Sequence, residues 1–513
     1  MVLNYYETRS GVNREPTKQK DVIFIDYDGT EIFSCSEDEL EHIRMPDNPS
    51  HSGLIAQGWN WTLPQIKEQL KECHGSPVYV GQLYITESGA TEVDIVLTDE
   101  RKKPTICFKN SIETTTIDWG DGNIESYSAS NTTRAISHEY ASGGSYTIKI
   151  FAPAGLEFNG NNVSGFIRDT GASSDPNDLY AVTVQNIRIG DCLNFNYRSL
   201  YNFYSLKTIT MSKNATASNA QVIVSGYSLQ SITFNPNCSF SLENSYSLKN
   251  ISLPYGLTSI VHGNMFTNCR SLEHITIPIT VTSIDSTGNM FGSCYSLKKI
   301  VLPKSITDFT QLVFSNCSSL KSVVLLGDAP INGAIKCASC YMLENITVPG
   351  GISDLLDNSF DACDLIESVV LHDGIAEIKK YAFRNCRRLV DINIPSSVVN
   401  IQSYAFTTCE ILNAIELNEG LESIGEQTFL GCYALESLTI PSTVTSIGYQ
   451  AFLNCPNIVE YHILPTIPPT LGGEAFKYIQ DTCTIYVPRG YLTAYQTATN
   501  WSEWASYMQE EPA

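Results

Sequence analysis

Sixteen cysteines are the most regularly placed reactive side chains of the sequence. Cys337 and Cys340 have the spacing of a redox pair or a metal site. Cys340, however, also belongs to a column of cysteines that recurs every 23 residues: Cys294, Cys317, Cys340, Cys363, Cys386, Cys409, Cys432 and Cys455. A column of one small residue is typical of a core in which free thiols pack as small hydrophobes. We therefore predict a ladder of buried, reduced thiols rather than disulfides or a redox pair.

Two carboxylates, Asp26 and Asp28, directly follow an apolar segment at 22–25. The string Phe24–Thr30 resembles the nucleophile motif of haloacid-dehalogenase-like phosphatases. In that family the first Asp attacks phosphorus, the second acts as acid and base, and Mg²⁺ lies between them. Such chemistry also needs a Lys and a second acidic pair on a doubly wound sheet, which the residues that follow are too few to build. We interpret the string as a strand with an Asp/Gly turn, and expect neither phosphatase activity nor a cofactor.

A third acidic group, Asp118, Asp121 and Glu125, surrounds a Trp-Gly-Asp-Gly string. These carboxylates could hold Ca²⁺, although acidic turn residues are usually only solvated. Together with His138–Tyr140 and the strand-like Gly144–Ile150, the string resembles a PKD-type Ig-like domain. The resemblance implies a spacer or adhesion module. We expect no metal here, while calcium binding by this domain stays open.

The sequence groups no nucleophile with a base. Its eight histidines are dispersed, and it contains no His-Glu-x-x-His, Gly-x-Ser-x-Gly or Gly-rich phosphate loop with Lys. A formal net charge of −22 argues against nucleic acid as a partner, since phosphate binding needs a basic face. No apolar run approaches the length of a membrane span. We therefore expect a protein that is not an enzyme, without a membrane span.

Tyrosines at one position of a repeat are the remaining candidates for binding. The position lies two residues before the first Leu of a unit, and Tyr341 and Tyr433 occupy it in later units. Tyr gives a large contact area at low entropic cost, and mixtures of Tyr, Ser and Asn are typical of adaptable binding surfaces. The predicted ligand-binding residues, for a cell-surface glycan or protein, are Tyr197, Tyr201, Tyr204, Tyr227, Tyr246 and Tyr295. The alternative is that these rings only pack one coil against the next.

The repeat that positions these tyrosines extends from about residue 206 to residue 455. Its clearest copy, Leu435–Cys455, opens with an alternating segment that predicts a short strand. Pro441 ends the strand because it has no N–H to donate, and a second apolar segment follows. One unit cannot bury its apolar residues alone, so the units are expected to stack into a solenoid with one continuous core.

The outward positions of the predicted strands carry small polar residues. From them we expect a soluble face that offers hydroxyl and amide groups. One column contains Thr208, Ser231, Asn250, Ser322, Asn345, Ser368 and Ser437, and the next contains Thr210, Thr233, Thr276, Thr347 and Thr439.

The Ile-Pro, Ala-Phe and Cys landmarks of the repeat resemble the BspA-like leucine-rich repeats, a bacterial branch of the leucine-rich repeat superfamily. The resemblance covers about half of the chain and implies recognition and adhesion rather than catalysis. Copies that begin at Leu248 and Leu272 carry extra residues, and Cys337 replaces the usual Phe in a third copy. We expect the rod to bulge or kink at these places.

The predicted fold class is mixed, mainly β. It consists of a leucine-rich-repeat solenoid of 23-residue repeats, preceded by an Ig-like β-sandwich and a small α+β N-terminal unit. The predicted organisation is a flexible arm at 1–20, the N-terminal unit at 21–76, the PKD-type Ig-like sandwich at 77–153, a cap with degenerate coils at 154–205, the solenoid at 206–460 and a C-terminal cap at 461–513.

The first 75 residues, with the string Met45–Trp61, resemble the N-terminal unit of phage and prophage structural proteins of gut bacteria. The resemblance implies attachment to other virion proteins through residues 1–76. The sequence shows neither an apolar signal segment nor an anchoring tail, which favours a virion component. We predict a non-enzymatic phage virion surface protein, a head or tail fibre, whose solenoid binds a bacterial cell surface or glycan. The alternative is a BspA-like adhesin at the bacterial cell surface, and a homo-oligomer stays open.

Overall fold

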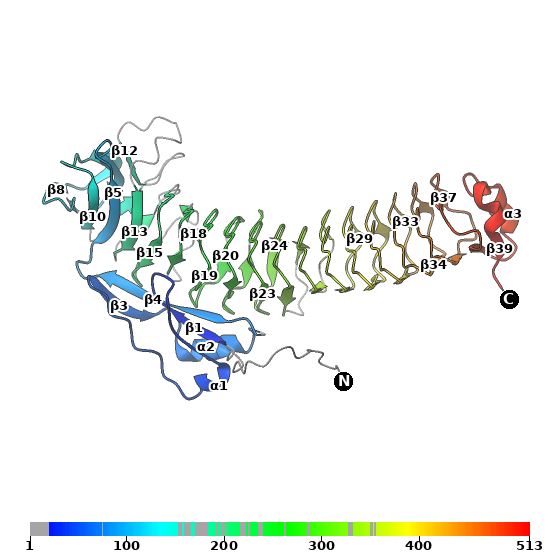
Figure 1. Cartoon of the computed structure of the whole chain (residues 1–513), viewed down its shortest axis with the longest axis horizontal. Helices are drawn as coiled ribbons and strands as arrows, with labels where there is room; N and C mark the ends of the chain where they lie inside the picture. Colours follow the sequence, from blue (N-terminus) through cyan, green and yellow to red (C-terminus); the bar gives the residue numbers. More distant parts are fainter. Residues whose placement is uncertain are drawn as a thin grey trace, which may run out of the picture.

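The protein is an elongated, gently curved rod of stacked coils, with two small units at one end and a helical cap at the other (Figure 1). With 6% helix and 34% strand, and about 12 turns of solenoid, this fold confirms the predicted class. The computed structural model describes residues 20–73, 75–151, 156–158, 166–169, 183–190, 193–195, 200, 203–215, 222–223, 226–233, 240–260, 263–284, 288–326, 332–348, 352 and 355–512.

The N-terminal unit is a four-stranded sheet with two short helices. Its elements are β1 (Val22–Ile25), β2 (Glu31–Cys35), α1 (Glu37–Leu40), β3 (Leu54–Trp59), α2 (Leu63–Leu70) and β4 (Val78–Thr86). The order is β2-β1-β4-β3, with β1 and β4 parallel. Capping boxes at Ser36 and Thr62 start the two helices. The sequence analysis assigned residues 77–153 to the Ig-like unit, but β4 bonds to β1 and β3, so this sheet extends to Thr86.

A second unit of two β-sheets follows. Its strands are β5 (Thr91–Leu97), β6 (Pro104–Asn110), β7 (Thr115–Asp118), β8 (Ile124–Tyr127), β9 (Ser130–Ser137), β10 (Gly144–Phe151), β11 (Leu156–Phe158), β12 (Ile167–Asp169), β13 (Thr183–Ile189) and β14 (Leu193–Phe195). One sheet has the order β12-β6-β11-β14, with β9 also paired to β6. Trp119 is buried between the sheets and stacks on His138. Strands β11 to β14 come from the segment that we assigned to the cap, so that segment completes this unit as well.

The other sheet of this unit continues into the solenoid without a break. β13 pairs antiparallel with β5 and parallel with β15 (Thr208–Met211), which gives the order β17-β15-β13-β5-β10-β7-β8. Arg188 of β13 reinforces the joint, because its guanidinium donates to both carboxylate oxygens of Asp94 at 2.7 Å. Backbone hydrogen bonds therefore fix the second unit to the first coil.

Most coils of the solenoid contribute one strand to each of two parallel ladders. The first ladder continues with β17 (Ser231–Ile232), β19 (Asn250–Ile251), β21 (His274–Ile275), β23 (Lys299–Leu302), β25 (Ser322–Leu325), β27 (Asn345–Val348), β28 (Ser368–Leu371), β30 (Asp391–Asn393), β32 (Ala414–Glu416), β34 (Ser437–Ile440), β36 (Glu460–Ile463) and β38 (Thr484–Val487). The second contains β16 (Val222–Ile223), β18 (Phe240–Ser241), β20 (Ser259–Ile260), β22 (Ser283–Ile284), β24 (Asp308–Val313), β26 (Asn332–Lys336), β29 (Glu377–Ile378), β31 (Asn400–Ile401), β33 (Ser423–Ile424), β35 (Ser446–Ile447) and β37 (Thr470–Leu471).

Phenylalanines and cysteines form two continuous series in the core. From Phe360 to Phe476 the rings stack coil upon coil, with centroids 5.2 to 5.8 Å apart. Each column thiol donates to a backbone carbonyl of the preceding coil; Cys409 Sγ, for example, lies 3.2 Å from Phe383 O. All described cysteines are buried free thiols. The predicted thiol ladder is thus confirmed for the described residues.

The C-terminal end of the core is closed by α3 (Leu492–Thr497), the 3₁₀ segment η2 (Ser502–Tyr507) and β39 (Met508–Glu510). The buried ring of Trp501 lies 5.7 Å from Phe476, the last ring of the series. Its Nε1–H donates to Pro469 O at 2.7 Å. Aromatic side chains therefore cover the core where no further coil follows. Within the described part of the chain, no helix has both the length and the hydropathy to cross a membrane.

We call residues 206–284 the early coils. The N-terminal unit lies across their strand face. Trp61 Nε1–H donates to Leu253 O at 2.8 Å, and Gln69 Nε2–H donates to Ile277 O at 3.0 Å. β4 approaches the coils closely at Gly81, where an added Cβ would lie only 3.3 Å from the side chain of Ser252. Hydrogen bonds and close packing thus dock this unit on the solenoid.

This docking corrects the predicted soluble face. In the early coils the outward residues Thr208, Thr210, Ser231, Thr233 and Thr276 are buried. In the late coils, a name we use for residues 366–464, the same positions are largely exposed, as at Ser437 and Thr439. The side chains of Asn345 and Thr347 lie outside the described residues. One set of positions therefore contacts protein at one end of the rod and solvent at the other.

Candidate functional site

Two residues before the first Leu, each early coil and the coil that follows contribute one side chain to a continuous stack. We call this stack the tyrosine ladder; it consists of Tyr204, Tyr227, Tyr246, Arg270 and Tyr295. The ring centroids of Tyr204 and Tyr227 are 4.8 Å apart, and those of Tyr227 and Tyr246 are 4.7 Å apart. The guanidinium of Arg270 lies 4.2 Å from the ring centroid of Tyr246 and 5.8 Å from that of Tyr295. These separations follow from the spacing of about 4.8 Å between paired strands.

Stacking gives the ladder a structural role and leaves part of each ring for a ligand. Aromatic pairs contribute about 0.5–1.5 kcal/mol beyond their buried area, so the ladder also joins neighbouring coils. The first three tyrosines are half-buried, and Tyr295 is 42% exposed. A ligand would contact ring edges along the stack and a ring face at Tyr295. Tyr197 and Tyr201, the other two predicted residues, lie outside the described residues.

Later coils use the same position differently. Tyr341 and Tyr433 are 46% and 41% exposed. Between them, Arg387 contacts Asp364 of the preceding coil at 3.9 Å and Glu410 of the next coil at 3.4 Å. In the late coils this position thus holds the ion-paired Arg387 and Glu410 and the exposed Tyr433 in place of a continuous ring stack.

A polar pocket of about 460 Å³ adjoins the ladder. The turn at Asp28 and Gly29 forms one wall, and residues next to the ladder positions form the other: Gln230, Ser247, Lys249, Asn250 and Ser271. Gly29 has a left-handed φ of 85°, and an added Cβ would lie 3.4 Å from the Ser231 side chain. The turn is therefore seated against the coil. Hydroxyl, amide, ammonium and carboxylate groups together suit a polar ligand.

Asp26 and Asp28, the pair that resembles a phosphatase motif, have separate structural roles. Asp26 is buried; its carboxylate accepts a hydrogen bond from the Tyr84 hydroxyl at 2.8 Å and lies 2.7 Å from His51 Nε2. Burial, and to a smaller extent the bond to Asp26, raises the pKa of the Tyr84 hydroxyl far above its ordinary value. Asp28 accepts the backbone N–H of Thr30 at 2.9 Å. These bonds shape the turn that borders the pocket.

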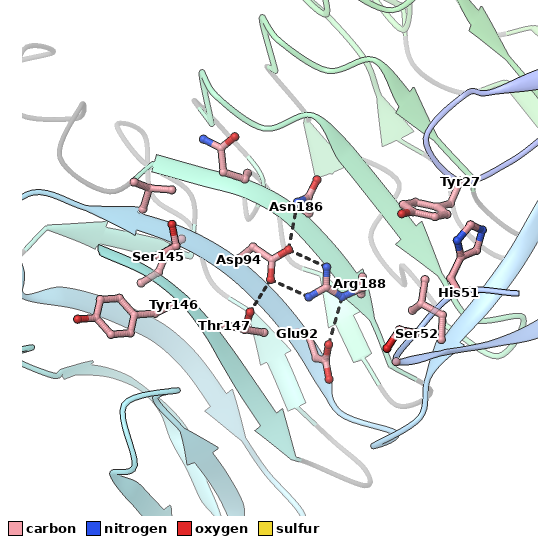
Figure 2. A pocket seen from close by; sticks show the side chains of 15 residues that line it. Tyr27, His51, Ser52, Glu92, Asp94, Ser145, Tyr146, Thr147, Asn186 and Arg188 are labelled. Atoms are coloured by element: carbon pink, nitrogen blue, oxygen red, sulfur yellow. Dashed lines mark hydrogen bonds and ion pairs between the residues drawn. The ribbon is translucent and has the colours of Figure 1, made fainter. Parts of the chain in front are cut away.

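A larger cleft, of about 560 Å³, lies where the N-terminal unit meets the sheet that joins the second unit to the solenoid (Figure 2). Tyr27 and His51 form its wall, while Asp94, Asn186 and Arg188 lie on its floor.

The floor of that cleft is occupied by mutual ion pairs and hydrogen bonds. Asp94 accepts from Arg188, from Thr147 Oγ1 at 2.8 Å and from Asn186 Nδ2 at 3.0 Å, and Glu92 accepts from Arg188 Nε at 3.2 Å. Although burial acts most strongly in the opposite direction, the bonds from Arg188 hold the pKa of Asp94 below its ordinary value. Because these charges satisfy one another, we interpret the cleft as a joint between units rather than the principal binding site.

The acidic group around the Trp-Gly-Asp-Gly turn bonds within the turn. Asp118 accepts a backbone N–H two residues on, Asp121 lies 2.8 Å from His138 Nε2, and Glu125 accepts the hydroxyl of Tyr127. Over the residues that the structure describes, no three His, Cys, Asp or Glu side chains gather in a way that could hold a metal ion. Calcium binding by this unit stays untested.

Cys337 and Cys340 are part of the core series. Both are buried; Cys340 Sγ donates to Phe314 O at 3.0 Å, and the carbonyl of Cys337 accepts Cys363 Sγ–H at 3.2 Å. These bonds are the same as those of the other column cysteines. The pair therefore fits the repeat rather than a separate redox or metal site.

Sequence reasoning missed the residues that dock the N-terminal unit, such as Trp61 and Gln69. Their partners lie about two hundred residues further along the chain, beyond the reach of local patterns. One signal was present in the outward strand positions. In the early coils these are Thr and Ser, whereas the late coils carry Val370, Asn393 and Glu416. The larger residues begin only beyond the early coils, which is consistent with close packing of the small residues there.

Comparison with known proteins adds one family match. The family described as "BspA type Leucine rich repeat region (6 copies)" matches residues 238–366 and 355–484. No curated protein matches the chain.

Several solved structures are similar. A leucine-rich repeat protein from Bacteroides ovatus is 19% identical over 64% of this chain and 95% of its own, with a TM-score of 0.47. A leucine rich cell surface protein from Faecalibacterium prausnitzii is 20% identical over 65% and 94%, with a TM-score of 0.34. The pneumococcal vaccine antigen PcpA is 17% identical over 71% and 84%, with a TM-score of 0.38. At these identities and scores the solved structures carry no further argument.

Proposed function

We propose that this protein, whose repeat region matches the BspA-type leucine-rich repeat family, is an adhesin-like binding protein that recognises a cell-surface glycan or protein through its tyrosine ladder. Repeats of this family generally occur in surface or binding proteins rather than enzymes. The proposal assigns recognition to one end of the rod and a spacer role to the rest.

The observation that carries the proposal is the ladder beside a polar pocket. Partly exposed rings provide contact area at low entropic cost, and the neighbouring Ser, Asn and Lys groups provide hydrogen bonds. The ring stack holds its shape before a ligand arrives, so binding needs little ordering of side chains. In the late coils the same position carries ion pairs, which contribute little contact area.

The virion placement predicted from the N-terminal string is a finer proposal, which no comparison supports. The string has an alternative role inside this chain, because Asn60 Nδ2–H donates to Ser252 Oγ at 3.0 Å and Trp61 docks on Leu253. Residues that hold two parts of one chain together need no virion partner to explain them. We therefore favour the adhesin. Detection of this chain in purified phage particles would reverse that preference.

The ladder is tested with Tyr204, Tyr227 and Tyr246 changed together to Phe. This variant retains the ring stack and removes only hydroxyl groups, so its unfolding midpoint should change by a few degrees at most. Binding to a glycan array and to intact epithelial cells should fall at least tenfold. Changing the same tyrosines to Ser removes the rings as well and should abolish binding.

The matched control is Tyr341→Phe combined with Tyr433→Phe, at the same position of later coils. It should bind like the unchanged protein. Loss of binding in this control, with binding retained by both ladder variants, would contradict the proposal.

A further inference from the structure

The ladder lies on a locally basic edge of a strongly acidic chain. The whole sequence carries a formal net charge of −22. One residue after the first Leu of the early coils, however, the side chains of Lys207 and Lys249 are exposed. The same position is acidic in the late coils, at Glu367 and Glu436. The early coils also carry Glu273 at this position, but Lys207, Lys249 and Arg270 together give this edge a local excess of positive charge.

Arg270 is the cation within the ladder itself. Its side chain is exposed, and no carboxylate of the described residues forms a salt bridge with it. Arg387, at the equivalent position of the late coils, has two acidic partners. The ring of Tyr246 covers one face of the Arg270 guanidinium, which leaves the N–H groups at its edge directed away from the ring.

Two carboxylates, Glu273 and Asp28, lie near these cations, and each also bonds to another group. Glu273 is paired with Lys298 at 2.5 Å, which lowers the pKa of Glu273. Asp28 faces Lys249 across the pocket, and one of its oxygens accepts the N–H of Thr30. Glu273 is thus shared between Lys298 and Lys249, whereas Arg270 has no salt bridge to a carboxylate of the described residues.

We infer that the ligand of the tyrosine ladder is an acidic glycan, with a carboxylate or sulfate group held by Arg270 and Lys249 and with sugar hydroxyls in the adjoining pocket. The inference rests on the proposed function and specifies its ligand. An edge-on guanidinium donates two parallel hydrogen bonds to a carboxylate or sulfate, and such charge-assisted bonds are stronger than neutral ones. A nucleic acid would offer anions too, but its dense phosphates would be repelled by the remaining acidic surface.

The test uses paired probes that differ only in charge. Polygalacturonate is compared with its methyl ester, and heparin with desulfated heparin, by surface plasmon resonance on the full chain. At least one acidic probe should bind ten times more tightly than its neutral partner, and the pair that does so identifies carboxylate or sulfate as the group recognised. Binding should weaken with added salt.

Substitutions of single arginines test which residue produces the preference for the acidic probe. Arg270→Gln should weaken the acidic probe about tenfold, or about 1.4 kcal/mol, with no change for the neutral one, and Arg270→Lys should restore part of the loss. Arg387→Gln, at the equivalent position of the late coils, should change neither.

Equal binding of charged and neutral probes, binding by none of the four, or tighter binding of single-stranded DNA would overturn the inference. If the tyrosine variants lose all binding but charged and neutral probes bind equally, the proposed function stands and only the acidic ligand is rejected. Unchanged binding in the tyrosine variants would reject both.

Discussion

The strand face of the early coils and that of the late coils are built on the same repeat and meet different surroundings. In the early coils Thr210 and Thr233 lie buried beneath the N-terminal unit. In the late coils the equivalent positions, Val370 and Glu416, are exposed. The regular repeat determines where side chains point, and the docked unit determines what those side chains must be.

This difference indicates which surface of the protein is accessible to a ligand. The N-terminal unit removes the early strand face from solvent, so the edge with the tyrosine ladder is the accessible part of those coils. The late coils leave their strand face open, but at the ladder position they carry ion pairs such as Arg387 with Glu410. Recognition and spacing are therefore assigned to different ends of one solenoid.

The largest expected difference between the two regions is in their stability at alkaline pH. An unfolded thiol titrates near pH 8.5, whereas burial raises the pKa of the column thiols in the late coils, to about 12 for Cys455. Their contribution to stability is complete below about pH 8.5 and is lost as pH rises towards the folded pKa. The late-coil thiols with raised pKa values are Cys386, Cys409, Cys432 and Cys455.

As these four thiols ionise in the unfolded chain, the free energy of unfolding should fall by about 5.6 kcal/mol per pH unit above pH 9, at about 1.4 kcal/mol for each thiol. Hydrogen exchange at pH 10 should show the late coils losing protection before the early coils. Replacing Cys386, Cys409 and Cys432 by Ala should flatten this dependence. Equal protection of both regions, or an unchanged slope in the triple variant, would show that the thiols do not control it.

A buried charge should distinguish the covered face from the open one. Thr233→Glu places a carboxylate beneath the N-terminal unit and should lower the free energy of unfolding by about 3–5 kcal/mol. The reverse exchange at the equivalent open position, Glu416→Thr, should change it by less than about 0.5 kcal/mol. Denaturant titration followed by circular dichroism measures both.

A second change at the same site has the opposite sign. Thr233 Oγ1 is buried and has no hydrogen-bond partner among the described residues. Thr233→Val keeps the shape and removes this unsatisfied hydroxyl, so stability should stay the same or rise by about 1 kcal/mol. If Thr233→Glu is as well tolerated as Thr233→Val, the N-terminal unit is not docked there in solution.

The docking hydrogen bond of Trp61 should have a smaller effect. Trp61→Phe keeps an aromatic ring and leaves Leu253 O without its donor, which should cost about 1–2 kcal/mol. Limited proteolysis should then cut the chain more quickly between the N-terminal unit and the early coils. Trp59→Phe is the control, since its indole donates within the unit, to Pro46 O. Identical cleavage rates in the two variants would contradict docking through Trp61.

The smallest effect is expected at the ion pairs of the late coils. Arg387→Gln removes contacts that are largely exposed, and such surface pairs contribute about 0–1 kcal/mol. The unfolding midpoint should remain within a degree or two of the original value. A loss of several degrees would mean that the ion pairs hold the late coils together as the stacked rings hold the early ones.

The solenoid could be predicted from sequence because its information is local and repeated. The spacing of Cys409 and Cys432, and the Phe before each, recurs in most coils, so one unit explains the rest. The covered face could not be predicted in this way. A Thr on a strand has the same local pattern whether solvent or another sheet faces it, and only the contact with Gly81 decides between them.

The candidate site was foreseen in part for the same reason. The repeat placed Tyr204, Tyr227 and Tyr246 in one column, and the ring contacts follow from that. The insertion of Arg270 into the stack and the wall supplied by Asp28 depend on side-chain packing and on the docked unit. Neither has a local sequence signature.

Hydroxyl-radical footprinting with and without bound target cells tests the central claim most directly. We predict that oxidation of the ladder residues Tyr227, Tyr246 and Tyr295 falls when cells are bound, while Tyr433 in the late coils is oxidised as before. Protection of Tyr433 with the ladder tyrosines unchanged would place recognition at the other end of the rod and contradict the assignment made here.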